Sequence, residues 1–291
     1  MTAISFNNKA LRRTVDSYGY TAYNGPIWLP TTFYNVPENG EGDYIWHADG
    51  ETYWTHNDLS YNLDVSSKTW NSVDVGTCNV GTNVWNDGNE TYLNIIIGSS
   101  CYVYKFDHNT KKFTNRVKQD YLVQGKYIWK VGGNVYFSCN TGDLSDPAHN
   151  LVWDSSTNKW KIKTWYFSTP MQNPGGLLGT NIWQYKGNTY CGDWDNNSEF
   201  VNLYKLDTST STWNITQWDG FCDVTGIDIW YDYTGEMYYC KWQSGGQWHM
   251  NTKTDKWDDI GPSVIVKYPM GRLVWTDGND IYYNNTHVLK R

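Results

Sequence analysis

The chain lacks the features of several common protein classes. Its formal net charge is −7, with 23 basic against 30 acidic residues, so it has no positive excess to neutralise nucleic-acid phosphates. No apolar run approaches the ~20 residues that a membrane-spanning helix needs. Residues 1–13 also lack the apolar core of a secretory signal peptide. We therefore expect no nucleic-acid partner, no membrane partner, and synthesis in a cytoplasm without export by the general secretory route.

The residues that metal or covalent chemistry needs are dispersed along the chain. The six cysteines form no CxxC pair, and the six histidines form no HxH or HExxH motif. Zinc sites need clustered ligands, and no nucleophile elbow, phosphate-binding loop or dinucleotide fingerprint is present. We expect no metal site, no cofactor and no catalytic residue, so the sequence predicts a protein that is not an enzyme.

Three cysteines follow the same tyrosine-rich element in successive repeats: Cys139, Cys191 and Cys240. Equivalent positions in different repeats are expected to lie too far apart to be bridged. We predict that these three are free, buried thiols, as expected for a protein made in a reducing compartment.

Residues that favour helices are also scarce, whereas residues that favour strands and turns are abundant. Aromatic residues make up 17% of the chain, with 18 Trp and 24 Tyr. Aromatic and β-branched residues favour strands, and Gly, Asn and Asp favour turns. No long stretch repeats apolar residues at helical spacing. The composition predicts an all-β fold.

An internal repeat of six units indicates the architecture. Each unit opens with an apolar residue and Trp, continues through a turn that contains Gly, and then enters a tyrosine-bearing strand. Successive opening Trp residues lie about 39 to 54 residues apart, which is typical of four-stranded propeller blades. The turns contain Gly in a form suited to tight hairpins. The six opening residues are Trp46, Trp85, Trp129, Trp183, Trp230 and Trp275.

The second half of each unit has a regular spacing of its own. An apolar strand ends in Asp or Asn, Ser or Thr follows three positions later, and an aromatic residue follows six positions later. The acidic or amide side chain is expected to cap a turn, and the aromatic residue to pack between neighbouring blades. The pairs are Asp64 and Trp70, Asp107 and Phe113, Asp154 and Trp160, Asp207 and Trp213, and Asn251 and Trp257.

These repeats predict one closed ring over residues 1–291. The sixth unit stops before its last strand, and residues 1–15 resemble the missing piece, with Leu11 in the aromatic position. Closure by an N-terminal strand would remove both exposed sheet edges. We predict a single six-bladed β-propeller of four-stranded antiparallel blades, with a long connection over residues 16–41. The expected blades are 42–75, 81–117, 125–163, 179–216, 226–260, and 271–291 with 1–15.

The repeat length, the tyrosine-bearing strand and the D-x-x-T-x-x-W spacing resemble those of the kelch family of β-propellers. The resemblance covers residues 42–291. Kelch repeats usually carry a Gly-Gly doublet at the end of the second strand, whereas this chain has pairs such as Trp54-Thr55 and Phe137-Ser138. The resemblance is therefore to a divergent branch, and it implies no particular family partner.

Residues outside the repeat pattern are the candidates for binding. Residues 16–41, 140–150 and 192–202 lengthen the connections between predicted strands, either as contact surfaces or as tolerated insertions. Aromatic side chains outside the pattern can stack on sugar rings or anchor protein interfaces when they are exposed. The binding candidates are Trp28, Trp54, Trp194, Trp242 and Trp248.

The composition resembles that of proteins exposed on virions: it is rich in Asn, Thr, Gly, Trp and Tyr, and poor in Lys and Glu. A bacteriophage virion protein, in the tail or on the capsid, fits this composition together with synthesis in the host cytoplasm. Its partners would be other virion or scaffold proteins and a host surface glycan or receptor. Two alternatives remain, a cytoplasmic kelch-type adaptor and a lectin-like glycan-binding propeller.

Overall fold

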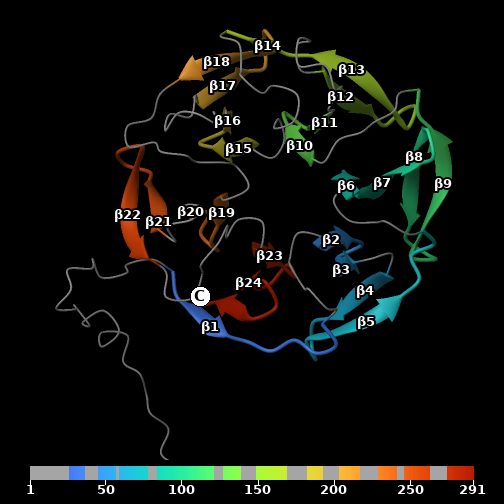
Figure 1. Ribbon diagram of the computed structural model, residues 1–291, viewed down its shortest axis with the longest axis horizontal. Helices are drawn as coiled ribbons and strands as arrows, with labels where there is room; N and C mark the ends of the chain where they lie inside the picture. The colour runs from blue at the N-terminus through green and yellow to red at the C-terminus, as the bar shows by residue number, and fades with distance from the viewer. Residues whose placement is uncertain are drawn as a thin grey trace, which may run out of the picture.

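The structure, a computed structural model, is a ring of six β-sheets around a central axis (Figure 1). The residues that it describes are 26–36, 45–56, 59–77, 84–120, 127–138, 149–168, 182–192, 203–216, 229–240, 246–262 and 274–291.

Each sheet contains one blade of four antiparallel strands, and the sheet of the fourth blade has one additional short parallel strand. The blades follow one another around the ring in chain order. The predicted all-β, six-bladed fold is confirmed. The first three blades are β2 (Ile45–Ala48), β3 (Glu51–His56), β4 (Leu59–Asp64) and β5 (Thr69–Val73); β6 (Val84–Asp87), β7 (Glu90–Ile97), β8 (Ser100–Asp107) and β9 (Lys112–Lys118); and β10 (Tyr127–Val131), β11 (Asn134–Ser138), β12 (His149–Asp154) and β13 (Lys159–Thr164). The next two are β15 (Ile182–Tyr185), β16 (Asn188–Gly192), β17 (Leu203–Asp207) and β18 (Thr212–Thr216); and β19 (Ile229–Tyr231), β20 (Met237–Cys240), β21 (Gly246–Asn251) and β22 (Lys256–Pro262).

The sixth blade combines the two ends of the described chain. Its inner strands are β23 (Val274–Thr276), β24 (Ile281–Tyr283) and β25 (His287–Leu289), and its outer strand is β1 (Trp28–Pro30). Strand β1 pairs antiparallel with β25, with Trp28 opposite Leu289. The described ranges contain no helix of the length and apolar character needed to span a bilayer.

Each blade contains one stacked Trp–Tyr pair, which explains the repeat seen in the sequence. The opening Trp lies on the innermost strand and faces a Tyr on the second strand. Its indole is 3–6% exposed in every blade, so these rings form the inner part of the core. Cross-strand aromatic pairs of this kind stabilise a sheet. The pairs are Trp46–Tyr53, Trp85–Tyr92, Trp129–Tyr136, Trp183–Tyr190, Trp230–Tyr238 and Trp275–Tyr282.

The aromatic residue at the start of each outer strand packs against the preceding blade, as predicted. For example, Trp160 of the third blade lies 4.9 Å from Trp85 of the second, measured between ring centroids. Likewise, Trp70 of the first blade lies 5.8 Å from Trp275 of the sixth. The outer aromatics Trp70, Phe113, Trp160, Trp213 and Trp257 are all at most 5% exposed.

Ring closure by an N-terminal strand is confirmed, but the closing strand is not the one predicted. Trp28, rather than Leu11, occupies the aromatic position, and its ring lies 5.3 Å from Trp230 of the preceding blade. The predicted closing segment, residues 1–15, lies outside the described residues. The D-x-x-T turn that marks the other outer strands cannot precede β1, because the chain enters the sixth blade there instead of turning back from β25. Strand β1 therefore lies within the predicted connection 16–41.

The chain that leaves an outer strand continues alongside the outer strand of the next blade. Tyr34 donates its backbone N–H to the Lys68 carbonyl and accepts from the N–H of Trp70. At the boundary between the third and fourth blades, β14 (Tyr166–Phe167) pairs in parallel with β18. We call these crossings stitches. Their hydrogen bonds include Tyr34 to Lys68, Phe113 to Val75, Trp160 to the Gln119 side chain, and Tyr166 to Ser211.

Gly76 lies in one of these stitches, and we predict that Gly76→Ala is destabilising. Its φ is +81°, and an added Cβ would lie 3.1 Å from Cβ of Lys112 and 3.2 Å from the Phe113 carbonyl oxygen. Gly50 is the matched control, since its φ is +74° with nothing within 4 Å. The positive φ alone costs an L-residue ~1–2 kcal/mol, and the close approach adds ~1–3 kcal/mol.

Urea unfolding of the two variants tests this prediction. Gly76→Ala is expected to lose clearly more unfolding free energy than Gly50→Ala. Equal losses would mean that the stitch does not hold the backbone close to the next blade.

The Asp-capped turns of the outer hairpins are built as the sequence predicts. Asp64, Asp107, Asp154 and Asp207 each accept the backbone N–H of the residue two positions later, and Asn251 does the same in the fifth blade. The residue four positions after the cap has a positive φ in every case, from 52° to 57°. Those residues are Lys68, Lys111, Asn158, Ser211 and Asp255.

These caps predict a loss of stability in acid. Hydrogen bonds from hydroxyl and backbone groups of the turn lower the pKa of Asp64, Asp107 and Asp207 below the ordinary value of 3.8. The pKa of Asp154 is also lowered, and the largest cause is the hydrogen bond from Lys161. A lowered folded-state pKa contributes stability that is present above the unfolded pKa and is lost as the pH falls through the folded pKa. We expect the urea midpoint to fall between pH 6 and pH 2.5.

The matched variant replaces Asp64, Asp107 and Asp207 with Asn, the residue that caps the fifth blade. It should fold and show a smaller fall between the two pH values, since an amide does not titrate in this range. If the urea midpoint falls as much in this variant as in the wild type, groups other than these three caps cause the acid sensitivity.

The predicted state of one cysteine is confirmed. Cys191 is buried and not disulfide-bonded, and the same holds for Cys101, whose thiol lies 3.0 Å from Oδ1 of Asn94. Cys139 and the side chain of Cys240 lie outside the described residues.

Candidate functional site

One face of the ring carries most of the described turns. The strands of each blade are antiparallel, so the turn between its first and second strands and the turn between its third and fourth strands lie at the same end. In the first blade these are residues 49–50 and 65–68. We call this the hairpin face. The predicted contact loops 140–150 and 192–202 connect second to third strands at the opposite end, and residues 140–148 and 193–202 lie outside the described residues.

Four of the six predicted tight hairpins have two-residue loops, and two do not. The loops are residues 49–50, 88–89, 132–133 and 186–187 in the first four blades. In the fifth blade pairing stops at Tyr231 and Met237, and in the sixth at Thr276 and Ile281.

Asp232 and Asp277 close these two wider loops by accepting backbone N–H groups within them. Such caps let a longer loop satisfy its own backbone without a Gly pair.

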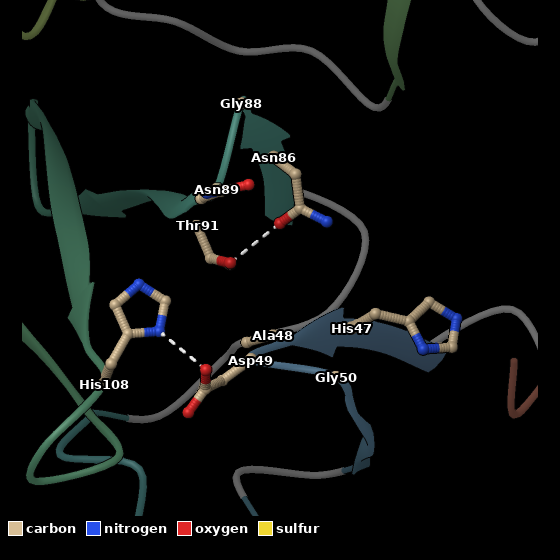
Figure 2. Close-up of a pocket in the computed structure, with 9 residues that line it drawn as sticks. All are labelled: His47, Ala48, Asp49, Gly50, Asn86, Gly88, Asn89, Thr91 and His108. Atoms are coloured by element: carbon tan, nitrogen blue, oxygen red, sulfur yellow. Dashed lines mark hydrogen bonds and ion pairs between the residues drawn. The ribbon is translucent and has the colours of Figure 1, made fainter.

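The hairpins of the first two blades enclose an open cavity of about 480 Å³, the blade 1–2 cavity (Figure 2). Strand β2 contributes its C-terminal end, strand β6 contributes Asn86, and the turn after β8 contributes His108. The sequence folds this way because Gly50 and Gly88, at positive φ, turn the two hairpins tightly enough to bring strand-end side chains to the rim. The lining residues are His47, Ala48, Asp49, Gly50, Asn86, Gly88, Asn89, Thr91 and His108.

Hydrogen bonds hold the polar walls of the cavity. Thr91 donates its hydroxyl to Oδ1 of Asn86 at 2.8 Å, which leaves the amide NH₂ of Asn86 to point away from Thr91. His108 bridges the two blades, with Nδ1 at 3.6 Å from Asp49 and Nε2 at 3.6 Å from Glu90. Figure 2 shows Asp49 facing His108, whereas His47 points to the other side.

The charges at the rim are mostly paired. Glu90 also contacts Lys105 at 2.9 Å, and this hydrogen bond is the main reason that the pKa of Glu90 is lowered. Burial lowers the pKa of His47, although the nearby Asp277 acts in the opposite direction. The lowered pKa favours the neutral imidazole, whose Nδ1 lies 3.3 Å from the Thr52 hydroxyl. The cavity presents amides, a hydroxyl, a carboxylate and imidazoles.

Such a set of groups can donate and accept hydrogen bonds with a polar partner. No group of three or more His, Cys, Asp or Glu side chains within the described part of the chain is arranged to hold a metal ion.

Two of the predicted binding residues are part of the core. Trp28 is 3% exposed and Trp54 is 0% exposed, so neither presents a ring to a ligand. Trp28 belongs to the closing strand. Trp54 lies on β3, a strand packed on both faces because each inner strand has a blade on either side, and its ring is 5.4 Å from Trp70. A position outside the repeat pattern therefore does not imply exposure.

Of the other three predicted residues, the structure describes only Trp248. Trp248 on β21 is partly buried against the core between the fourth and fifth blades. Trp194 and Trp242 lie outside the described residues. None of the three described candidates, Trp28, Trp54 and Trp248, lines the blade 1–2 cavity.

The sequence did contain a signal for the cavity residues. Asp49-Gly50 and Gly88-Asn89 were recognisable as hairpin turns, and all such turns lie at one end of a propeller. The polar turn residues of adjacent blades were therefore better candidates than the aromatic residues. His108 also follows a recognisable cap, Asp107, at that same end.

The fold places the chain in the class of six-bladed β-propellers. No protein-family model matches the chain, and no curated protein matches it either. The kelch-like assignment accordingly remains a resemblance in repeat length and spacing.

Proposed function

We propose that the chain is a non-enzymatic binding module that holds a partner on its hairpin face. The observation that supports this proposal is the blade 1–2 cavity. It lies on a rigid ring, because buried aromatic residues pack neighbouring blades against each other. Strand ends fix the side chains that line it, and preorganised donors and acceptors reduce the entropy lost on binding. Propeller folds serve many functions, so the proposal depends on the cavity and not on the fold alone.

The more specific form of the proposal is a bacteriophage virion protein, in the tail or on the capsid, that docks other virion proteins or binds a host receptor. Its support is the composition, which is rich in Asn, Thr, Gly, Trp and Tyr and poor in Lys and Glu. A closed ring also suits an exposed particle, since it leaves few unpaired strand edges for aggregation.

Sedimentation of native source material tests the virion role. Gradient fractions are probed for the protein by mass spectrometry, and we expect it to travel with particles far larger than 33.8 kDa. If it remains among small soluble proteins, the virion role is wrong, and the adaptor or lectin-like alternative takes its place.

Variants of the blade 1–2 cavity test the binding surface. Purified wild-type protein, Asn89→Ala and His108→Ala are compared for binding to the particle or to host cells, and both variants should bind at least tenfold more weakly. His287→Ala is the control, because His287 begins β25 at the opposite end of a blade. Equal binding by all four proteins would exclude this cavity as the binding surface.

A further inference from the structure

The wider hairpins of the fifth and sixth blades leave two cavities on either side of Tyr233. The outer Tyr233 cavity has a volume of about 620 Å³, and the inner one, beside the innermost strands, about 380 Å³. Pockets for small ligands are typically ~300–1,000 Å³. The inner Tyr233 cavity is lined by Ile229, Trp230, Tyr231, Tyr233, Val274, Trp275, Thr276, Gly278, Asn279 and Ile281.

Tyr233 forms a fixed wall between the two cavities. Its hydroxyl accepts the backbone N–H of Ile281 at 3.1 Å and lies 3.1 Å from the Leu289 carbonyl oxygen, so a side chain of the fifth blade is anchored in the sixth. The Arg291 guanidinium lies over the ring, 5.0 Å from its centroid. Arg291 lines the outer cavity and not the inner one. The ring is therefore held in place before any ligand arrives.

The inner cavity combines aromatic walls with uncharged polar groups. Tyr231 is 41% exposed, and its hydroxyl donates to the Gln184 carbonyl oxygen at 2.8 Å, which fixes the ring at the rim. Trp230 and Trp275 border the cavity but are buried, at 3% and 6% exposure, so Tyr231 and the partly buried Tyr233 supply its accessible aromatic surface. No acidic or basic side chain is among the described residues of the lining. These walls suit a ligand that has an apolar face and no charge.

Two polar side chains are placed to contact such a ligand. Two side chains hold the main chain of Asn279. Its N–H donates to the Asp277 carboxylate at 2.8 Å, and its carbonyl oxygen accepts a hydrogen bond from the Arg291 guanidinium. The Asn279 side-chain amide has no partner among the described residues. Thr276 Oγ1 accepts the N–H of Gly278 at 3.0 Å, so its own hydroxyl hydrogen can still be donated.

We propose that the inner Tyr233 cavity binds a neutral saccharide. A pyranose ring has an apolar C–H face that packs on aromatic rings, and hydroxyl groups that pair with an amide and a hydroxyl. This inference rests on the binding role proposed above, for which it names a ligand class and a second site on the same face. The described residues that line the blade 1–2 cavity include no Trp or Tyr, so this cavity is the poorer match for a sugar ring.

Saturation-transfer NMR and calorimetric titration with D-glucose, D-galactose, D-mannose and N-acetyl-D-glucosamine test the proposal on the full chain. At least one of these sugars should bind. Asn279→Ala should weaken that binding about tenfold, the effect of one lost hydrogen bond. Tyr231→Ala removes a wall of the cavity and should weaken it by at least tenfold.

Two control variants separate stacking from folding. Tyr231→Phe keeps the ring and loses only the hydrogen bond to Gln184, so it should bind nearly as well as the wild type. Tyr166→Ala removes a tyrosine that is 60% exposed on the outer strand β14, and it should bind unchanged. Circular dichroism of each variant confirms that the ring is intact.

The result that overturns the proposal is the absence of binding by all four sugars, or binding that Tyr231→Ala and Asn279→Ala leave unchanged. Sugar binding that is lost in Asn89→Ala and kept in Tyr231→Ala would also overturn it, while supporting the binding role at the blade 1–2 cavity. Capture of a protein partner through Tyr231 without any sugar binding would replace the saccharide with a peptide.

Discussion

Deleting residues 1–36 is expected to abolish the cooperative unfolding transition of the whole ring. The deletion removes β1 and, with it, Trp28 and Phe33, which are 3% and 6% exposed. Truncation of a buried Trp or Phe typically costs ~3–5 kcal/mol, and total domain stability is only ~5–15 kcal/mol. Loss of β1 also exposes the edge of β25 and the indole of Trp230. We expect a protein that elutes as aggregate and shows no sharp thermal transition by near-UV circular dichroism.

Deletion of residues 1–15 is the matched comparison. The hypothesis that Leu11 fills the aromatic position predicts that this shorter deletion opens the ring, whereas a closing strand at Trp28–Pro30 predicts that the transition survives. A sharp transition in both truncated proteins would show that closure does not determine stability. If both truncated proteins lose the transition, residues 1–15 are needed to close the ring.

Replacing Trp54 with Ala is expected to lower the free energy of unfolding by ~3–5 kcal/mol. Trp54 is fully buried between the first and sixth blades, where it contacts Trp70 and lies in one cluster with Phe33 and Trp275. Its indole has no access to solvent, so the substitution should change stability and not ligand contact. Urea unfolding followed by tryptophan fluorescence gives the loss directly.

Leu59→Ala is the control for this variant. Leu59 begins the neighbouring strand β4 and is 55% exposed, so its truncation should change stability by no more than ~0.5 kcal/mol. A Trp54→Ala protein of near wild-type stability that fails to bind the particle or host cells would restore Trp54 as a binding residue.

The repeat chemistry made most of the fold predictable. A Trp at the start of each unit faces a Tyr on the next strand, as at Trp46 and Tyr53, and both side chains are needed in every blade. The aromatic residue six positions after each Asp cap is likewise required at every boundary between blades. Because each contact recurs around the ring, a single sequence displays it several times, and the spacing alone indicates the architecture.

Features that occur once could not be recognised in this way. Strand β1 has no preceding cap, so its Trp28 looked like a loop residue. The wide hairpins at Asp232 and Asp277 contain Gly, as the tight ones do, but their loop lengths depend on where pairing stops. The blade 1–2 cavity depends on how closely Asp49 and His108 approach across two blades, a distance that no local pattern records.

The position of β1 also constrains the order in which the ring can form during synthesis. The described strands of the first five blades each pair with neighbours that are close in sequence, whereas Trp28 pairs with Leu289 near the other end of the chain. Contacts of such long sequence separation form slowly, because the entropy of closing the loop is lost first. During synthesis on the ribosome, β1 therefore cannot pair until β25 has been made. Until β25 emerges, Trp28 and the edge of β1 remain without their partners. The chain is most prone to aggregate in this interval, because an apolar side chain and an unpaired strand edge are both exposed.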